Sequence, residues 1–168
     1  MSRIQNLIRK SEHSWFSRML LNTAAAYAIP FNRPHHFNIV EIRPGFAKIK
    51  LPNHRINRNH VNSIHACGLA TLSEFTAGLA MLGRISEKDY RIILKRLNME
   101  YHYQAKSHVF ASQEVSEAFV RDKIRQPLLT NDSVLVELNT SIFDVQGNHI
   151  STATTEWQFK KWDKVRTK

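Results

Sequence analysis

The longest apolar stretch of the chain lies at residues 64–82. Its apolar and small side chains fall on nearly every side of a helix, so little polar surface is left. We therefore expect a helix at 64–82 that the rest of the chain covers almost all round, and Gly83 is expected to end it. The apolar positions include Cys67, Leu69, Leu72, Phe75, Leu79 and Leu82.

The segments on both sides of this helix have the patterns of β-strands. Apolar residues at 37–42 and 46–51 flank the turn dipeptide Pro44-Gly45, which predicts a hairpin. The polar run 53–62 predicts a loop. After the helix, alternation with period two predicts four long strands, and 116–124 is expected to be a helical crossover. The four strands are expected at 92–103, 108–115, 134–142 and 150–159.

Residues 1–34 predict a helical extension that begins near Ser2 and stops by Pro30. Its apolar residues have helical spacing, while Arg3, Lys10 and Arg18 fall mostly on the other side. Such a helix either packs on the domain or lies on a membrane surface. The apolar stripe is wide, so we favour packing and keep peripheral membrane contact as the alternative. A signal peptide is less favoured, because Glu12 and the Asn22-Thr23 pair interrupt the apolar stretch.

These patterns together predict an α+β fold in which a long antiparallel sheet wraps around one central helix. The chain divides into a helical extension at 1–34 and a domain at 35–168. With 168 residues, 42% hydrophobic and 23% charged, the composition is that of a globular protein. Cys67 is the single cysteine, which excludes an internal disulfide and fits a cytoplasmic protein.

The chain is strongly basic, with 24 Lys and Arg against 14 Asp and Glu, or a net charge of +10. This charge attracts polyanions such as nucleic acid, anionic lipid or a phosphate-bearing ligand. No nucleic-acid-binding motif accompanies it, so we expect no specific nucleic-acid partner. The cations that could form a patch are Lys95, Arg96, Arg121, Lys123, Arg125, Lys160, Lys161 and Arg166.

Glu74 is the residue most out of place, since it lies in the middle of the apolar helix. A buried carboxylate is costly unless it is paired or used, and burial raises its pKa toward that of a base active near neutral pH. Glu74 could instead meet an arginine, contact a second copy of the chain, or reach solvent. The start of the helix, at His65 and Ala66, offers free N–H groups to an anion or a developing oxyanion. Asn59 lies in the loop just before it.

The spacing Asn59-x5-His65-Ala66-x7-Glu74 resembles the helix signature of hotdog-fold thioesterases of the PaaI type, in an uncharacterised bacterial branch. That family has Asn, then His-Gly-Gly, then an acidic residue near mid-helix. The resemblance implies a hotdog fold and a hydrolase that cleaves acyl thioesters, above all acyl-coenzyme A. In this chain His-Ala-Cys replaces His-Gly-Gly.

The resemblance also implies a role for each matching residue. The N–H of Ala66 would polarise the thioester carbonyl, and Glu74 would act as general base or nucleophile. Asn59 would help to place water or substrate, and His65 would shape the start of the helix. Ala66 and Glu74 are about 12 Å apart along one helix, too far to serve one carbonyl together. We therefore expect a homodimer or tetramer with the site across the subunit interface, as in hotdog dimers.

Other functions are weighed against this one. Cys67 could be a nucleophile, but we expect it to be a small buried residue. The histidines fit no zinc pattern and the glycines form no phosphate loop, so we expect neither a metal nor a cofactor, with coenzyme A entering only as part of the substrate. A hotdog hydratase would need a longer His-to-acid spacing and a Pro-Gly before the helix. The remaining alternative is a non-catalytic protein that binds acyl-coenzyme A or an acyl carrier.

Overall fold

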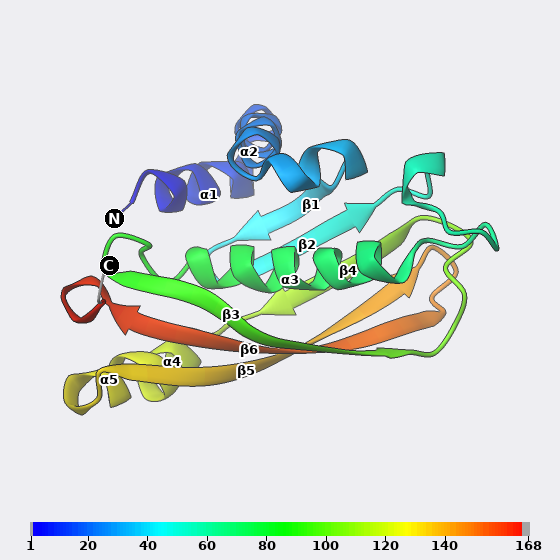
Figure 1. The fold of residues 1–168 in the computed structure, drawn as a ribbon. Coiled ribbons are helices and arrows are strands. Elements are labelled where there is room, and N and C mark those ends of the chain that lie inside the picture. Colours follow the sequence, from blue (N-terminus) through cyan, green and yellow to red (C-terminus); the bar gives the residue numbers. More distant parts are fainter. Residues whose placement is uncertain (1, 166–168) are drawn as a thin grey trace.

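A computed structural model describes residues 2–165 of the chain (Figure 1). The helices are α1 (Arg3–His13), α2 (Trp15–Ala28), α3 (Ala66–Leu82), α4 (Glu117–Val120) and α5 (Pro127–Thr130). The strands are β1 (Asn38–Arg43), β2 (Phe46–Leu51), β3 (Tyr90–Tyr101), β4 (Val109–Glu114), β5 (Ser133–Asp144) and β6 (His149–Lys161). Short helical turns are η1 (Pro30–His35), η2 (Arg55–Asn57), η3 (Arg121–Arg125) and η4 (Trp162–Lys164).

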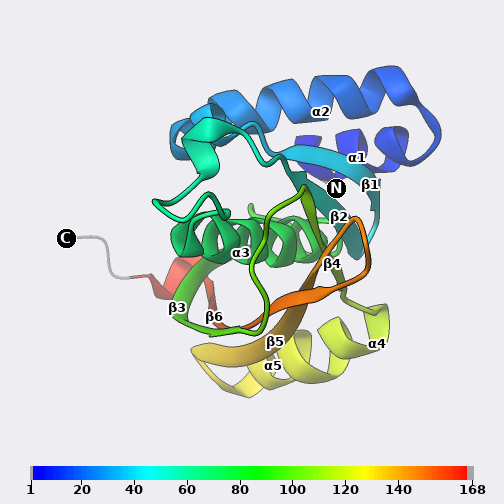
Figure 2. The same cartoon turned by 90° about the vertical axis from the view of Figure 1, so that its right-hand side faces the viewer.

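The described strands form one antiparallel sheet in the order β1-β2-β4-β5-β6-β3. The sheet curves around α3, which lies in its hollow with the extension above β1 (Figure 2). The predicted α+β architecture is confirmed, as are the hairpin and the four later strands, whose ends shift by a few residues. The crossover between β4 and β5 is made of α4, η3 and α5 rather than one helix.

The helix α3 packs on the sheet through Leu72, Ala77 and Met81, none of which is accessible to solvent. The expectation that α3 is covered almost all round is wrong for a single chain. Cys67 is exposed, while Glu74 and Gly78 are only partly buried. These positions have helical spacing, so they form one stripe. The stripe remains open because the curved sheet encloses the helix from one side only.

Glycine ends α3 at Gly83, as predicted, but for a different reason. Gly83 has a φ of −62°, so no left-handed backbone is required there. A Cβ atom at this position would lie 2.8 Å from the backbone nitrogen of Gly45. The glycine is therefore needed for the close approach of the helix end to the β1–β2 turn.

The extension contains two helices instead of one continuous helix. Ser14 ends α1 and its hydroxyl accepts a hydrogen bond from the N–H of Ser17, which starts α2. Ser2 caps α1 as expected. Ile8 and Leu21 are buried in the main core, which confirms that the extension packs on the domain. None of the helices within residues 2–165 has the length and apolar character required to cross a membrane.

Candidate functional site

The start of α3 is held in place by Asn57, which is 2% exposed. Its amide nitrogen donates to the carbonyl oxygens of Pro52 and His35, at 2.9 and 3.0 Å. Its own carbonyl oxygen accepts from the N–H of His65 at 2.7 Å. Asn57 therefore fixes the backbone that leads into the helix. No sequence pattern marks this role, because Asn57 is one of several polar residues in a polar loop.

His65 is the N-cap of α3. Its Nδ1 atom accepts a hydrogen bond from the N–H of Cys67 at 3.1 Å, and its carbonyl oxygen accepts from Gly68 and Leu69. The side chain thus takes up one N–H of the first turn, as a capping residue does. The N–H of Ala66 has no acceptor among residues 2–165. It is available to a ligand at the positive end of the helix dipole.

Asn59 organises the loop in front of this N–H. Its side-chain oxygen accepts from the N–H groups of Val61 and Ser63, both at 3.1 Å. With that oxygen occupied, the amide nitrogen is the part of the side chain left to meet water or substrate. Asn59, Ser63 and Ala66 line a common cavity of about 310 Å³.

Tyr101, at the end of β3, lines the same cavity and was not singled out from the sequence. Its hydroxyl donates to the carbonyl oxygen of Ala66 at 3.3 Å. Burial, and secondarily the neighbouring Cys67, raise the pKa of Tyr101, so the phenol remains a donor at neutral pH. In the sequence Tyr101 was one of several alternating strand residues, and only the fold brings it to the helix start.

Glu74 lies in the open stripe of α3, and burial raises the pKa of its carboxyl group. No ion pair to Glu74 is formed within residues 2–165, so nothing in this part of the chain offsets the cost of the charge. Glu74 borders a largely apolar cavity of about 400 Å³, whose walls include Phe75, Gly78 and Trp157. The buried indole N–H of Trp157 has no hydrogen-bond partner in the described chain.

The structure therefore divides the four predicted residues between two places. Asn59 and Ala66 share one cavity, with His65 shaping the helix beside them, whereas Glu74 lines another cavity further along α3. Within a single chain they do not converge on one reacting atom. Ala66 and Glu74 of one α3 therefore cannot serve the same carbonyl together.

Two further expectations are affected by the structure. Cys67 is exposed, so the expectation of a small buried residue is wrong: it lies on the open stripe of α3.

In the basic patch, Arg121 pairs with Asp122 at 2.7 Å and Arg125 pairs with Glu117, which reduces the free positive charge there. Arg166 lies outside the described residues.

The chain matches a known protein family over most of its length. The family described as a domain of unknown function (DUF4442) matches residues 17–163. The chain belongs to the DUF4442 family. No curated protein matches its sequence.

Solved structures resemble this DUF4442 protein over most of its length. PA5026 from Pseudomonas aeruginosa, a protein of unknown function called a probable thioesterase, has a TM-score of 0.79 at 19% identity, covering 85% of this chain and 95% of the other. A thioesterase family protein from Silicibacter pomeroyi has a TM-score of 0.65 at 14% identity, covering 83% and 96%. The E. coli PaaI protein from the phenylacetic acid degradation operon has a TM-score of 0.61 at 12% identity, covering 88% and 96%. The DUF4442 chain thus has the hotdog fold, and the predicted resemblance is confirmed at the level of the fold.

Proposed function

We propose that this DUF4442 protein hydrolyses acyl thioesters, with acyl-coenzyme A as the substrate. The observation that carries the proposal is that one helix holds a free N–H at Ala66 and, further along, a half-buried carboxylate at Glu74, neither with a partner among residues 2–165. Both occupy the positions at which the chain resembles PaaI-type thioesterases. The hotdog fold of the thioesterase-named structures supports the same chemistry.

The reaction uses these groups as follows. The thioester carbonyl oxygen accepts a hydrogen bond from the N–H of Ala66, which stabilises the negative charge that develops on it. The Glu74 carboxylate takes a proton from water while the water oxygen attacks the carbonyl carbon. The tetrahedral intermediate collapses, the C–S bond breaks, and the thiolate of coenzyme A leaves and takes up a proton. The products are a carboxylic acid and free coenzyme A.

The shape and charge of the molecule fit such a substrate. The apolar cavity beside Glu74 offers a place for the acyl group, with Trp157 and Phe75 in its walls. The net charge of +10 attracts the phosphates of coenzyme A. Asn59 supplies an amide donor next to Ala66 for water or for the pantetheine arm.

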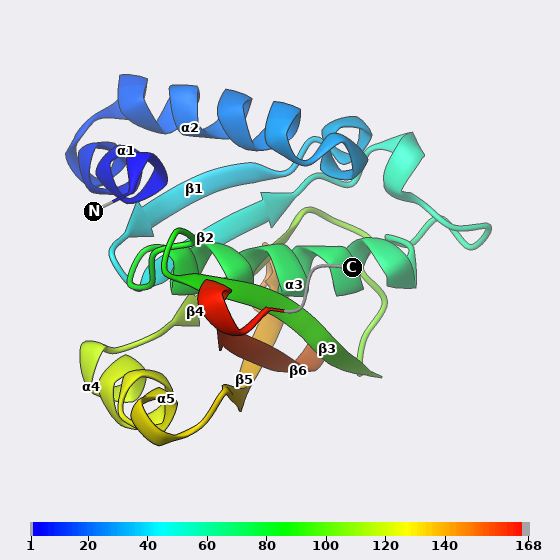
Figure 3. The same cartoon turned by 60° about the vertical axis from the view of Figure 1, so that its left-hand side comes forward.

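The active unit in this proposal is a dimer built on β3. This strand is 12 residues long and, among the described strands, pairs only with β6, so its outer backbone edge is free. The unpaired backbone groups of an edge of this length can form hydrogen bonds with a strand of another chain. Figure 3 shows β3 and the open side of α3 next to each other. Pairing of two β3 edges about a twofold axis would bring two antiparallel copies of α3 together, with Ala66 of one copy facing Glu74 of the other.

A thiol-release assay over a panel of acyl-coenzyme A esters tests the proposal. The Glu74→Gln variant removes the base at nearly constant size, and we expect it to lower kcat about a hundredfold or more. Glu137→Gln, which changes an exposed carboxylate on β5, is the matched control and should keep full activity. Full activity in the Glu74→Gln protein would rule out this mechanism. Binding of several esters with no turnover of any would instead favour the non-catalytic acyl-coenzyme A carrier.

A further inference from the structure

The helix α2 is turned with its apolar side outward. Phe16 and Leu20 are 63% and 51% exposed, and Trp15 and Tyr27 are 69% and 65% exposed. With 100° per residue these four side chains, together with Met19, occupy one continuous side of the helix. A surface helix of a globular domain has the opposite orientation, with its apolar stripe on the core.

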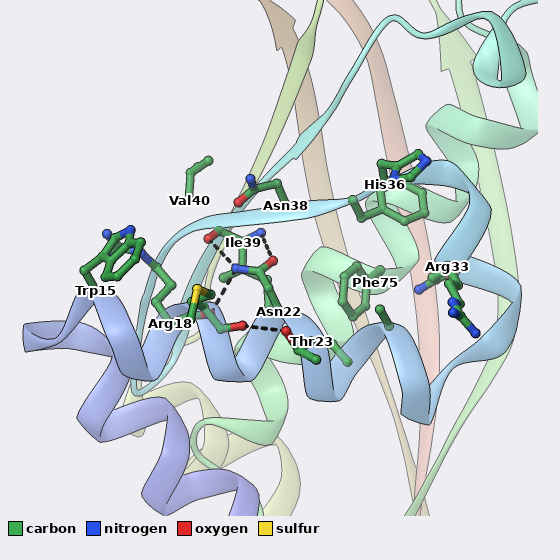
Figure 4. Close-up of a pocket in the computed structure, with 15 residues that line it drawn as sticks. Trp15, Arg18, Asn22, Thr23, Arg33, His36, Asn38, Ile39, Val40 and Phe75 are labelled. Carbon is green, nitrogen blue, oxygen red and sulfur yellow. Dashed lines mark hydrogen bonds between the residues drawn. The ribbon is translucent and has the colours of Figure 1, made fainter.

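The rotation of α2 about its own axis is set by Asn22 together with the buried Leu21. The amide nitrogen of Asn22 donates to the carbonyl oxygen of Ile39 at 3.2 Å, and its side-chain oxygen accepts from the N–H of Ile39 at 2.7 Å (Figure 4). The Asn22 amide thus makes the hydrogen bonds to the Ile39 backbone that a neighbouring strand would make at the outer edge of β1. On the same helix Leu21 is 2% exposed and lies about 140° around the axis from Phe16 and about 100° from Leu20. With Leu21 in the core and Asn22 on β1, Phe16 and Leu20 are left on the outer side of α2.

The segment that carries this apolar side is basic. Residues 1–36 contain a single acidic residue, Glu12, which faces His13 at 3.8 Å. On the neighbouring strand Glu41 is paired with Arg43 at 2.9 Å. The basic residues of the segment are Arg3, Arg9, Lys10, Arg18 and Arg33.

A hollow of about 680 Å³ between α2 and β1 borders the same surface (Figure 4). Arg18, Arg33 and His36 line it, and none of the described residues that line it is acidic. Arg33 also stacks on the ring of Tyr27, 4.9 Å from its centre. Exposed aromatic and aliphatic side chains therefore lie next to positive charge that has no protein partner of opposite sign in the hollow.

We propose that the outer side of α2 docks on a lipid bilayer that carries anionic headgroups. The apolar side chains would enter the boundary between headgroups and acyl chains, and the arginines beside them would contact the headgroup phosphates. At 14 residues α2 is too short to cross a bilayer, so the contact is peripheral. In Figure 2 α2 and β3 lie on opposite sides of α3, and only the segment after α2, at Ile29 and Asn32, lines a cavity together with β3. Docking requires no catalysis, so the inference does not rest on the proposed function.

Sedimentation of the full-length protein with lipid vesicles tests this inference. One set of vesicles contains phosphatidylcholine with phosphatidylglycerol, and the other contains phosphatidylcholine alone. We expect the wild type to sediment with the first set and much less with the second. Phe16→Ser combined with Leu20→Ser should weaken binding about tenfold or more, since two inserted apolar side chains are lost. Arg18→Gln combined with Arg33→Gln should reduce the preference for phosphatidylglycerol.

The matched control is Leu129→Ser combined with Leu135→Ser, two leucines that are 77% and 50% exposed on α5 and β5. This protein should bind vesicles as the wild type does. Wild type that fails to sediment with the anionic vesicles would overturn the proposal. Unchanged binding of the Phe16→Ser, Leu20→Ser protein would do the same, because attraction would then come from charge alone. The surface would instead bind a second copy of the chain if two results came together. The wild type would bind no vesicles, and the Phe16→Ser, Leu20→Ser protein would have a smaller particle mass than the wild type in analytical ultracentrifugation.

Discussion

At the scale of single residues, two neighbouring N–H groups in the first turn of α3 differ in whether they have a hydrogen-bond acceptor. The ring of His65 takes up the N–H of Cys67, while the N–H of Ala66 has no acceptor in the described chain. A histidine cap thus leaves the N–H of Ala66 free at a residue that lines the same cavity as Asn59 and Tyr101. The replacement of His-Gly-Gly by His-Ala-Cys preserves this donor, because alanine keeps its N–H and adopts the helical backbone without strain.

Replacing Ala66 by proline removes this donor selectively. Proline is well tolerated at the first position of a helix, and the extended backbone of His65, with ψ at 140°, is compatible with a following proline. We expect kcat for acyl-coenzyme A hydrolysis to fall about 10²–10³-fold while the circular dichroism spectrum is unchanged. Ala66→Gly retains the N–H and should retain activity. Comparable kcat values for Ala66→Pro and Ala66→Gly would exclude the N–H of Ala66 as the oxyanion donor.

The raised pKa of Glu74 gives two linked pH effects. A base must be ionised, so kcat/KM should fall as the pH is lowered through this raised pKa, above the range of an ordinary glutamate. The folded state also holds the proton more tightly than the unfolded state, so the free energy of unfolding should decrease as pH rises through the same window. Glu74→Gln stays neutral and should therefore be more stable than the wild type above the window and equal to it below. Urea unfolding at acid and neutral pH measures this difference, and a Glu74→Gln protein less stable at neutral pH would contradict it.

At the scale of elements, the extension serves as the cover of a sheet edge. The outer edge of β1 has no further strand beside it in the described chain, and Asn22 satisfies both backbone groups of Ile39 there. The buried side chains of Ile8 and Leu21 join α1 and α2 to the main core. The edge is thus protected from unwanted strand pairing by a helix that offers an amide in place of a strand.

Asn22→Ala should loosen this cover. Two hydrogen bonds to Ile39 are lost and its backbone groups lose their partner, so we expect the free energy of unfolding to drop by about 1–3 kcal/mol. Thr23→Ala is the matched control, since its hydroxyl bonds only within α2, to Met19, and is exposed. Hydrogen exchange at the amide of Ile39 should accelerate in Asn22→Ala alone. Equal effects of the two substitutions would show that Asn22 is not the anchor.

At the scale of the whole molecule, the proposed dimer would account for both the open stripe of α3 and the outer edge of β3, which has no strand beside it in the described chain. Both lie on the side that a second copy would cover, and the two halves of the proposed site lie in separate cavities of one chain. A twofold dimer would cover the open stripe of α3 and supply hydrogen-bond partners for the outer edge of β3. It would also bring Ala66 of one copy close to Glu74 of the other. The docking surface proposed on α2 is separated from β3 by α3 along most of the helix, so the two proposals are compatible.

Complementation between two inactive variants tests the shared site. When Glu74→Gln and Ala66→Pro chains are co-expressed, a mixed dimer has one intact site and one site that lacks both groups. Random pairing at equal amounts should restore about a quarter of wild-type activity. A site contained in one chain would give no recovery in the mixture. Each variant alone, and a mixture with Glu137→Gln, provide the reference values.

Periodicity alone determined the central helix, the strands and the turn at Gly45, while the resemblance to PaaI-type thioesterases singled out Asn59, His65, Ala66 and Glu74 as the candidate site. These features are local, because they depend on which residues recur on one side of a helix or strand. The strand order and the exposure of Cys67 required the folded chain, since pairing and burial depend on residues far apart in sequence. Asn57 and Tyr101 could not be found beforehand for the same reason: their partners at the helix start come from other segments. The outward side of α2 was also decided by tertiary structure, because burial of Leu21 and two hydrogen bonds from Asn22 to β1 set the rotation of a helix whose apolar pattern alone predicted burial.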